Sequence, residues 1–357
     1  MVSNESDEKV IGFPRAMSYF THYPFWYGFF NHLGIKVVLS DTTTKEIVSN
    51  GASLVVTETC LPIKIFVGHV LDLINKGVKK IFVPSIQSIA PKIYNCSKIR
   101  GLPDLIRNIV KQDFELIEPT LDKSEKGQGF YTFLKESVAC FGITDFDVIR
   151  DASKSGWKLY NNFLIMARSG IPYKKAFNNA LKGKIILEND DKEYSISVAV
   201  AAHDYDVFDE HASMKIFDKL EKMGVKVYTS IRLTDEKKIE GLNTLDQKMY
   251  WANELEMTGT AGHYLKNNKI DGLITVNSFG CGPDSLMIEK ITRKAKEFGK
   301  PVLSLTIDEH TGEAGFITRL EAFVDMLFRK KRNIIVKTLN MKDTEFKPKT
   351  NTCENLI

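Results

Sequence analysis

The chain has 357 residues, enough for two or three domains at about 150 residues per domain. Apolar residues make up 43% and charged residues 26%, a balance typical of globular proteins that bury a core without disulfides. The net charge of +4 is too small to indicate a dedicated nucleic-acid-binding protein. No apolar run approaches the roughly 20 residues that span a membrane, and the polar start MVSNESDEKV does not resemble a signal peptide. We therefore expect a cytoplasmic protein that binds neither nucleic acid nor membrane.

Short apolar runs alternate with helical patterns in the first third of the chain. The expected strands are 10–13, 35–39, 53–57 and 80–84, and the expected helices are 22–33, 43–50 and 64–77. A second alternating stretch has expected strands at 195–203, 225–230, 271–278 and 301–308, with helices at 212–224, 244–267, 284–298 and 316–330. Alternation of this kind predicts parallel sheets covered by helices on both faces.

The segment between these two stretches has helical patterns after the polar break KSEKGQG, and the last residues lack sustained periodicity. The prediction is therefore an α/β protein with two Rossmann-like parallel-sheet domains that flank a mainly helical insertion. Its parts are an N-terminal domain at 1–120, the insertion at 121–190, a C-terminal domain at 191–335 and a tail at 336–357.

Five cysteines are scattered along the chain and do not form a disulfide framework: Cys60, Cys96, Cys140, Cys281 and Cys353. They are either buried apolar thiols or a ligand set that folding assembles. Cys60, Cys96 and Cys281 each follow an expected strand, at the edge where parallel α/β proteins bind ligands. Each also lies near glycine or proline, which shape loops around bulky ligands. Thiolates alone, without the short spacings of zinc sites, suit an iron–sulfur cluster.

Ionisable residues also gather after the expected strands. Arg15 is either a cation near a bound anion or a surface arginine at a helix start, and His203 is either a proton donor or part of a capped turn. Asp308, Glu309 and His310 suit proton-coupled redox chemistry, with His310 the expected donor, or a salt-bridge network that anchors the last helix.

Several long blocks in one order carry a family resemblance. They include IGFPRAMSYFTHYPFWYGFFNHLGIKVVLSD (11–41), ETCLPIKIFVGHVLDL (58–73), NCSKIRGLPDLIR (95–107), NSFGCGPDSL (277–286) and LSLTIDEHTGEAGFITRLEAFVDML (303–327). With these blocks the chain resembles the activase-related branch of the 2-hydroxyacyl-CoA dehydratase superfamily. That superfamily also includes the benzoyl-CoA reductase subunits and the double-cubane cluster proteins.

The resemblance implies a 4Fe-4S cluster held by Cys60, Cys96 and Cys281, with Cys140 as a candidate fourth ligand. It also implies electron transfer at low potential under anaerobic conditions. The electron would come from a separate ATP-dependent activator protein, and the substrate would be a small molecule or an acyl-CoA. The leading hypothesis is a reductase or dehydratase component. The alternatives are a non-catalytic cluster carrier, assembly or regulatory partner, and an α/β protein without a cluster. Whether the chain forms a dimer stays open.

Overall fold

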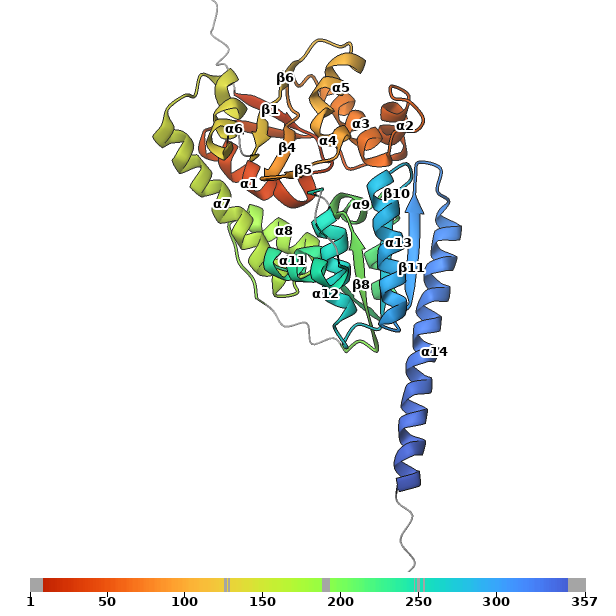
Figure 1. The fold of residues 1–357 in the computed structure, drawn as a ribbon. Helices are drawn as coiled ribbons and strands as arrows, with labels where there is room; N and C mark the ends of the chain where they lie inside the picture. Colours follow the sequence, from red (N-terminus) through yellow and green to blue (C-terminus); the bar gives the residue numbers. More distant parts are fainter. Residues whose placement is uncertain are drawn as a thin grey trace, which may run out of the picture.

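The computed structural model describes residues 9–345, except residues 125, 126, 128, 188–192, 247, 249, 250 and 253. Figure 1 shows two halves, an N-terminal half coloured red to yellow and a C-terminal half coloured green to blue. Each half contains a four-stranded sheet in which all neighbouring strands are parallel. The predicted α/β class with parallel sheets is therefore confirmed.

The N-terminal sheet has the order β2 (Lys36–Leu39), β1 (Val10–Phe13), β3 (Lys80–Phe82) and β6 (Glu115–Ile117). Its helices are α1 (Tyr19–His32), α2 (Lys45–Ala52), α3 (Leu61–Asn75) and α5 (Leu102–Ile109). Aromatic side chains join α1 to the sheet: the rings of Phe13 and Phe82 stack with centroids 5.4 Å apart, and Trp26 packs on Phe82 at 4.5 Å. The aromatic-rich first helix is thus explained by core packing.

The C-terminal sheet has the order β11 (Val302–Ile307), β10 (Gly272–Ser278), β8 (Ile196–Ala202) and β9 (Val225–Tyr228). Strand β10 is buried along its whole length, as expected for a central parallel strand covered on both faces. This half also contains helices and short helical turns. The helices are α9 (Asp204–Phe208), α10 (Ile216–Lys222), α11 (Asp235–Thr244), α12 (Thr260–Leu265) and α13 (Gly282–Glu297), and the turns are η2 (Ser230–Arg232) and η3 (Leu255–Gly259).

A third, small sheet was not expected, and its strands alternate in sequence with the last strands of the N-terminal sheet. Its order is β5 (Ile93–Tyr94), β4 (Ser85–Ala90) and β7 (Thr120–Asp122). The pair β4–β5 is antiparallel, whereas β4 and β7 are parallel. The strands are short and polar residues interrupt them, so their hydrophobic pattern gives almost no signal. Strand β5 ends two residues before Cys96, which begins the short helix α4 (Ser97–Arg100).

Helices fill the middle of the chain, in the region where a helical insertion was expected. They are α6 (Gly129–Val138), the 3-10 turn η1 (Ala139–Phe141), α7 (Phe146–Arg168) and α8 (Tyr173–Leu181). Helix α7 packs against α1 and against η2, so it contacts both halves (Figure 1). The domain boundaries themselves stay a prediction.

The expected strand at 53–57 is wrong, because these residues form a turn between α2 and α3. The two helices touch directly: a Cβ atom at Gly51 would lie 1.9 Å from the Lys64 carbonyl oxygen, and one at Gly68 would lie 2.0 Å from the Ile47 carbonyl oxygen. This close packing leaves no layer in which a strand could lie between them. Accordingly Val56, in the middle of the expected strand, is 71% exposed.

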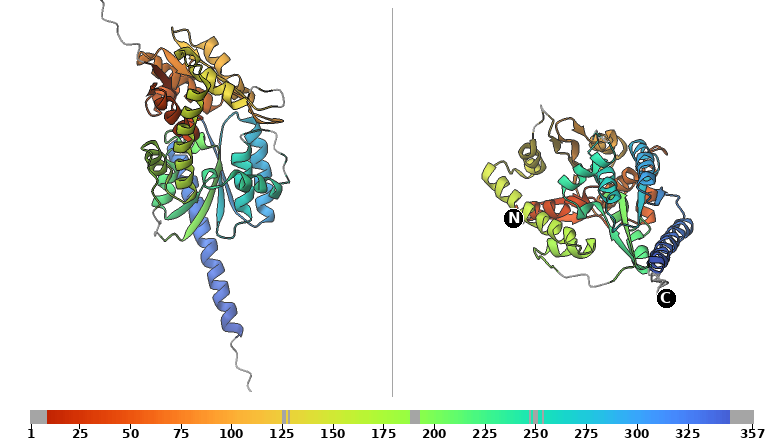
Figure 2. Two further views of the ribbon diagram at one scale, coloured as in Figure 1. Left: turned by 90° about the vertical axis from the view of Figure 1, so that its left-hand side faces the viewer. Right: turned by 60° about the horizontal axis from the view of Figure 1, so that its bottom comes forward.

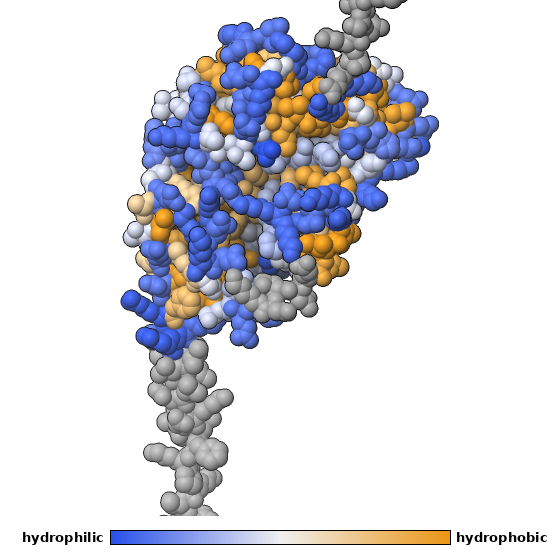
Figure 3. Space-filling model, turned by 180° about the vertical axis from the view of Figure 1, so that it is seen from behind, coloured by the Kyte–Doolittle hydropathy of each residue, from blue (hydrophilic) through white to orange (hydrophobic). Residues whose placement is uncertain are grey.

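The last helix is longer than expected. Helix α14 runs over Glu313–Glu345 rather than ending near residue 330, and it extends away from the rest of the molecule (Figures 1 and 2). Residues 336–345, expected to be a tail, are therefore helical, while Cys353 lies outside the described residues. In the described part of the chain no helix is both long and apolar enough to span a membrane. Figure 3 shows that hydrophilic side chains cover much of the face seen from behind, with hydrophobic patches between them.

Candidate functional site

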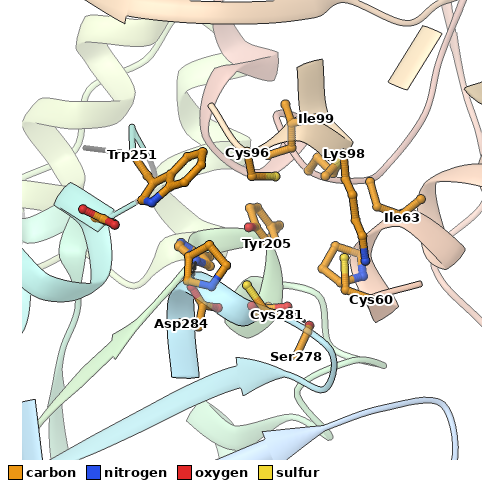
Figure 4. A pocket seen from close by; sticks show the side chains of 16 residues that line it. Cys60, Ile63, Cys96, Lys98, Ile99, Tyr205, Trp251, Ser278, Cys281 and Asp284 are labelled. Atoms are coloured by element: carbon orange, nitrogen blue, oxygen red, sulfur yellow. Dashed lines mark hydrogen bonds and ion pairs between the residues drawn. The ribbon is translucent and has the colours of Figure 1, made fainter. Parts of the chain in front are cut away.

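A pocket lies between the two halves, and side chains from both line it (Figure 4); its empty space, including open solvent, is about 530 Å³. Three of the predicted ligands, Cys60, Cys96 and Cys281, line this pocket. The predicted proton donor His203 lines it too. The structure thus brings together four predicted site residues that are up to 221 positions apart in sequence. We call this the cysteine pocket.

Each of the three cysteines stands immediately before a helix. Cys60 is the N-cap residue of α3, Cys96 that of α4 and Cys281 that of α13, and none uses its side chain to cap the helix. Proline in the first turn of α3 and α13 starts both helices without needing a backbone hydrogen-bond donor. The positive ends of α3 and α13 therefore face the thiol groups of Cys60 and Cys281 and favour negative charge there.

The three cysteine-bearing loops meet at one backbone atom, the carbonyl oxygen of Glu58. The ammonium group of Lys98, two residues after Cys96, donates a hydrogen bond to this oxygen at 3.4 Å. A Cβ atom at Gly280, one residue before Cys281, would lie 3.0 Å from the same oxygen. Gly280 also has a φ of +78°, which non-glycine residues rarely adopt. Glycine at this position therefore lets the Cys281 loop approach the Cys60 loop.

Burial favours the protonated form of two of the pocket thiols, Cys60 and Cys281. Burial raises the pKa of Cys60, an effect that the positive charge of Lys98 opposes. Burial also raises the pKa of Cys281, and the nearby charge of Asp284 raises it further. Because a coordinating metal deprotonates thiols outright, thiolates in this pocket need a cationic partner such as iron.

A buried acid–base cluster borders the cysteine pocket on the C-terminal side. His203 Nε2 lies 2.9 Å from Asp284 Oδ1, and its Nδ1 lies 3.6 Å from Glu256 Oε2. Burial alone would lower the pKa of His203, but the charge of Asp284 and its hydrogen bond raise this pKa well above the usual value. The ring is therefore a buried imidazolium held between carboxylates.

Asp206 is a second ionisable group of the pocket. It accepts a hydrogen bond from Ser278 Oγ at 2.8 Å, and burial raises its pKa to about 7. Its other oxygen, Oδ2, is buried without a hydrogen-bond partner among the described residues. Sequence reasoning did not select Asp206 or Asp284, although both signals were present: each carboxylate follows a strand of the C-terminal sheet, in HDYD and CGPD.

The other predicted catalytic residues lie elsewhere. Arg15, Glu309 and His310 line a second cleft that shares no lining residue with the cysteine pocket. The side chain of His310 is 84% exposed, and Glu309 forms an ion pair with the buried Lys64 of α3. The structure therefore does not bring His310 to the cysteines as their proton donor. Glu309 instead joins the segment after β11 to the N-terminal half.

Cys140 does not join the other three cysteines. It lies in η1 and lines a separate pocket with Val10 and Lys80, the first residues of β1 and β3. These residues mark the amino edge of the N-terminal sheet, whereas Arg15 follows the carboxyl end of β1. Burial raises the pKa of Cys140, with partial opposition from Lys80. As a fourth ligand, Cys140 would have to reach the cysteine pocket from the opposite edge of this sheet.

Three thiols line the cysteine pocket, and their arrangement can be compared with what a metal group requires. Among the described residues, no group of three histidine, cysteine or acidic side chains is close enough to hold one metal ion. The three thiols instead surround a space, and thiolates that ligate different irons of a cubane must stand farther apart than ligands of one ion. The residues present are thus compatible with three-point attachment of an iron–sulfur cluster.

Two protein families match different parts of the chain. Residues 10–232 match a family described as the CoA enzyme activase uncharacterised domain. Residues 211–327 match the family of the 2-hydroxyglutaryl-CoA dehydratase D-component, whereas no curated protein matches the chain. Both families agree with the expected superfamily. Because the first match spans more than half of the sequence, the chain belongs to the CoA enzyme activase uncharacterised domain family, and its C-terminal half is similar to the dehydratase D-component.

Proposed function

We propose that this chain is an iron–sulfur redox protein related to the 2-hydroxyacyl-CoA dehydratases, with one 4Fe-4S cluster held by Cys60, Cys96 and Cys281. The observation that carries the proposal is that these three cysteines, each at the start of a helix, line one pocket between the halves. The dehydratase-type match over residues 211–327 supports the same chemistry.

When bound, the cluster would supply one-electron transfer and one iron that carries no thiolate of this chain. The chain's own residues would control its surroundings. The ammonium group of Lys98 and the positive ends of α3 and α13 offset the negative charge of three thiolates. Apolar side chains such as Ile63, Ile99 and Trp251 line the same pocket and limit its contact with water.

His203 and Asp206 replace His310 as the proposed proton donors. Both line the cysteine pocket, whereas His310 lines the other cleft. A hydrogen bond of 2.9 Å between His203 Nε2 and Asp284 Oδ1 fixes the orientation of the histidine ring. Asp206 accepts a hydrogen bond from Ser278 with one oxygen, and its buried Oδ2 has no partner among the described residues.

The proposed electron donor is a separate ATP-dependent activator protein, and the proposed substrate is a small molecule or an acyl-CoA. The CoA enzyme activase and dehydratase descriptions of the matching families support both assignments. A non-catalytic cluster carrier is the second candidate. The narrowness of the pocket favours it, because its empty space of about 530 Å³ includes open solvent and must hold the cluster together with any ligand.

The test of the cluster is the iron and acid-labile sulfide content of anaerobically purified protein. We expect about four of each per chain, and their loss when Cys60, Cys96 or Cys281 is changed to serine. Cys140→Ser is the matched control, because Cys140 lines a different pocket and its replacement should leave the iron content unchanged. Full iron content in the Cys281→Ser variant would contradict the proposed ligand set.

The test of turnover uses an activator protein, ATP and candidate substrates. We expect His203→Gln to keep the iron but to slow substrate reduction. The control is His263→Gln, because this histidine of α12 lines neither the cysteine pocket nor the second cleft. Reduction of the cluster without any substrate turnover would favour the carrier.

A further inference from the structure

We propose that the second cleft, which contains Arg15, binds the phosphate group of a small molecule. The empty space of the cleft, including open solvent, is about 2250 Å³, compared with about 530 Å³ for the cysteine pocket. Its walls come from the segments that follow β1, β2, α9 and β11, so the carboxyl edges of both main sheets contribute. Open α/β sheets bind ligands at these edges. The inference does not depend on a cluster, because the two pockets share no lining residue.

The acidic side chains of the cleft are already engaged within the protein. Glu210 pairs with Lys174, Glu309 with Lys64 and Glu313 with Lys219. The two aspartates accept hydrogen bonds from neighbouring threonines: Asp308 from Thr311 and Asp209 from Thr43. The three ion pairs offset the negative charges of the glutamates, whereas the two aspartates are hydrogen-bonded but keep their charges.

Three cations of the cleft have no such partner. Arg15, Lys45 and Lys215 line it, and none forms an ion pair with a carboxylate anywhere in the described part of the chain. Lys45 and Lys215 are exposed side chains, so both can swing toward a bound anion. Three positive charges without an ion-pair partner therefore stand against the two carboxylates Asp209 and Asp308, which leaves a small positive surplus in the cleft that favours an anionic ligand.

Arg15 is the most constrained of these cations. Its backbone N–H donates to Ser40 Oγ at 2.8 Å, which ties the turn after β1 to the end of β2. Its guanidinium carbon lies 5.8 Å from the centre of the Tyr19 ring. The Nε atom is buried and lacks a hydrogen-bond acceptor among the described residues. An unsatisfied buried donor is costly, and a phosphate that accepts from the guanidinium fork would remove this cost.

The backbone adds a second sign of functional constraint. Met214 and Lys215 both line the cleft, and both have positive φ angles, of +50° and +55°. Two consecutive non-glycine residues in this region store strain that the rest of the fold must offset. The strained turn places the Lys215 side chain on the cleft. Tyr19 and Tyr173, both half-buried, supply an aromatic wall beside the cations.

The test is isothermal titration calorimetry on the anaerobically purified full chain, with inorganic pyrophosphate and ADP as separate probes. We expect saturable binding of at least one probe, and about tenfold weaker binding in Arg15→Lys, because lysine cannot form the bidentate contact. The double variant Lys45→Gln/Lys215→Gln should also bind several-fold more weakly. Since both of its positions are exposed, this variant tests the cleft even if changes at Arg15 disturb folding.

Two comparisons define the ligand and the site. Tighter binding of ADP than of pyrophosphate assigns an organic phosphate that uses the aromatic wall, and equal binding assigns the phosphate group as the recognised feature. Lys158→Gln is the control, because this exposed lysine of α7 lies outside the cleft and should leave the affinity unchanged. No saturable binding of either probe would overturn the proposal. So would unchanged affinity in both the Arg15→Lys variant and the double-lysine variant.

Discussion

The ion pair between Lys64 and Glu309 offers the most direct test of how the two halves are held together. Lys64 lies in α3, four residues after Cys60, and its ammonium group also donates to the Thr57 carbonyl oxygen at 2.9 Å. The exposed fractions of the two side chains are 4% and 16%. Burial alone would raise the pKa of Glu309, but the hydrogen bond from Lys64 holds this pKa below its usual value. Replacing Lys64 with methionine keeps most of the length of the side chain and removes the charged ammonium group.

The expected loss can be worked out from this burial. Breaking a buried ion pair by removing one partner costs about 3–5 kcal/mol, because the remaining charge stays in the protein without compensation. Glu309 keeps 16% exposure, so water partly solvates its carboxylate, and we expect a value near the lower limit, about 3 kcal/mol. At about 2 °C per kcal/mol for a chain of this size, Tm should fall by about 6 °C.

The assay is thermal and urea unfolding of Lys64→Met, Glu309→Gln and the double variant. The double variant should lose less stability than the sum of the single variants, because residues in direct contact couple by about 0.5–3 kcal/mol. Lys76→Met is the matched control, since Lys76 follows the same helix but is 30% exposed and pairs with Asp72 and with the exposed Asp41. Its loss should be below about 1 kcal/mol. If Lys64→Met cost no more than this control, the ion pair would not join the halves as argued.

Three further predictions follow from the geometry. Gly280→Ala should destabilise the protein by about 1–3 kcal/mol and lower iron binding, because the φ of +78° at Gly280 disfavours a side chain and the new Cβ atom would lie 3.0 Å from the Glu58 carbonyl oxygen. The control Gly282→Ala has open space around its Cβ position and should change neither property. Urea unfolding and iron content measure the two effects. Gly51→Ala should lower Tm, because its Cβ would lie 1.9 Å from a backbone oxygen of α3 and push α2 away; an unchanged Tm would refute the direct α2–α3 contact. Burial lowers the pKa of His69 to about 4, whereas its value in the unfolded state is about 6.5. Between these two pH values the unfolded state binds more protons than the folded state. The free energy of unfolding should therefore fall by about 3 kcal/mol as the pH drops from 6.5 to 4. The His69→Gln variant should show a smaller acid-induced loss in urea unfolding measured across this range, and an identical pH profile would contradict the assignment.

The sequence alone was sufficient for the elements whose signal is local. Strands β1, β8 and β10 and helices α1, α3 and α13 lie where apolar runs and helical periodicity predicted them, within a few residues. The same information failed where packing between distant segments decides the structure. Residues 53–57 carry a strand-like apolar run, yet they form a turn because Gly51 and Gly68 let α2 and α3 touch. The small sheet of β4, β5 and β7 escaped prediction because its strands have little hydrophobic pattern.

The candidate site divides in the same way. Residue type and loop chemistry were enough to select Cys60, Cys96 and Cys281, and the fold places all three around one pocket. Cys60 was selected by a partly wrong argument, since no strand precedes it and its position comes from the start of α3.

Only the tertiary structure could show that Arg15, Glu309 and His310 belong to a different cleft from His203. All four follow strands at carboxyl edges, and a sequence does not state how two such edges face each other. That arrangement depends on contacts between the halves, such as Lys64 with Glu309 and Gly280 beside Glu58, whose members are more than 200 residues apart. Long-range packing therefore decided which ionisable groups share a pocket with the cysteines, whereas local composition decided only that such groups would gather at the sheet edges.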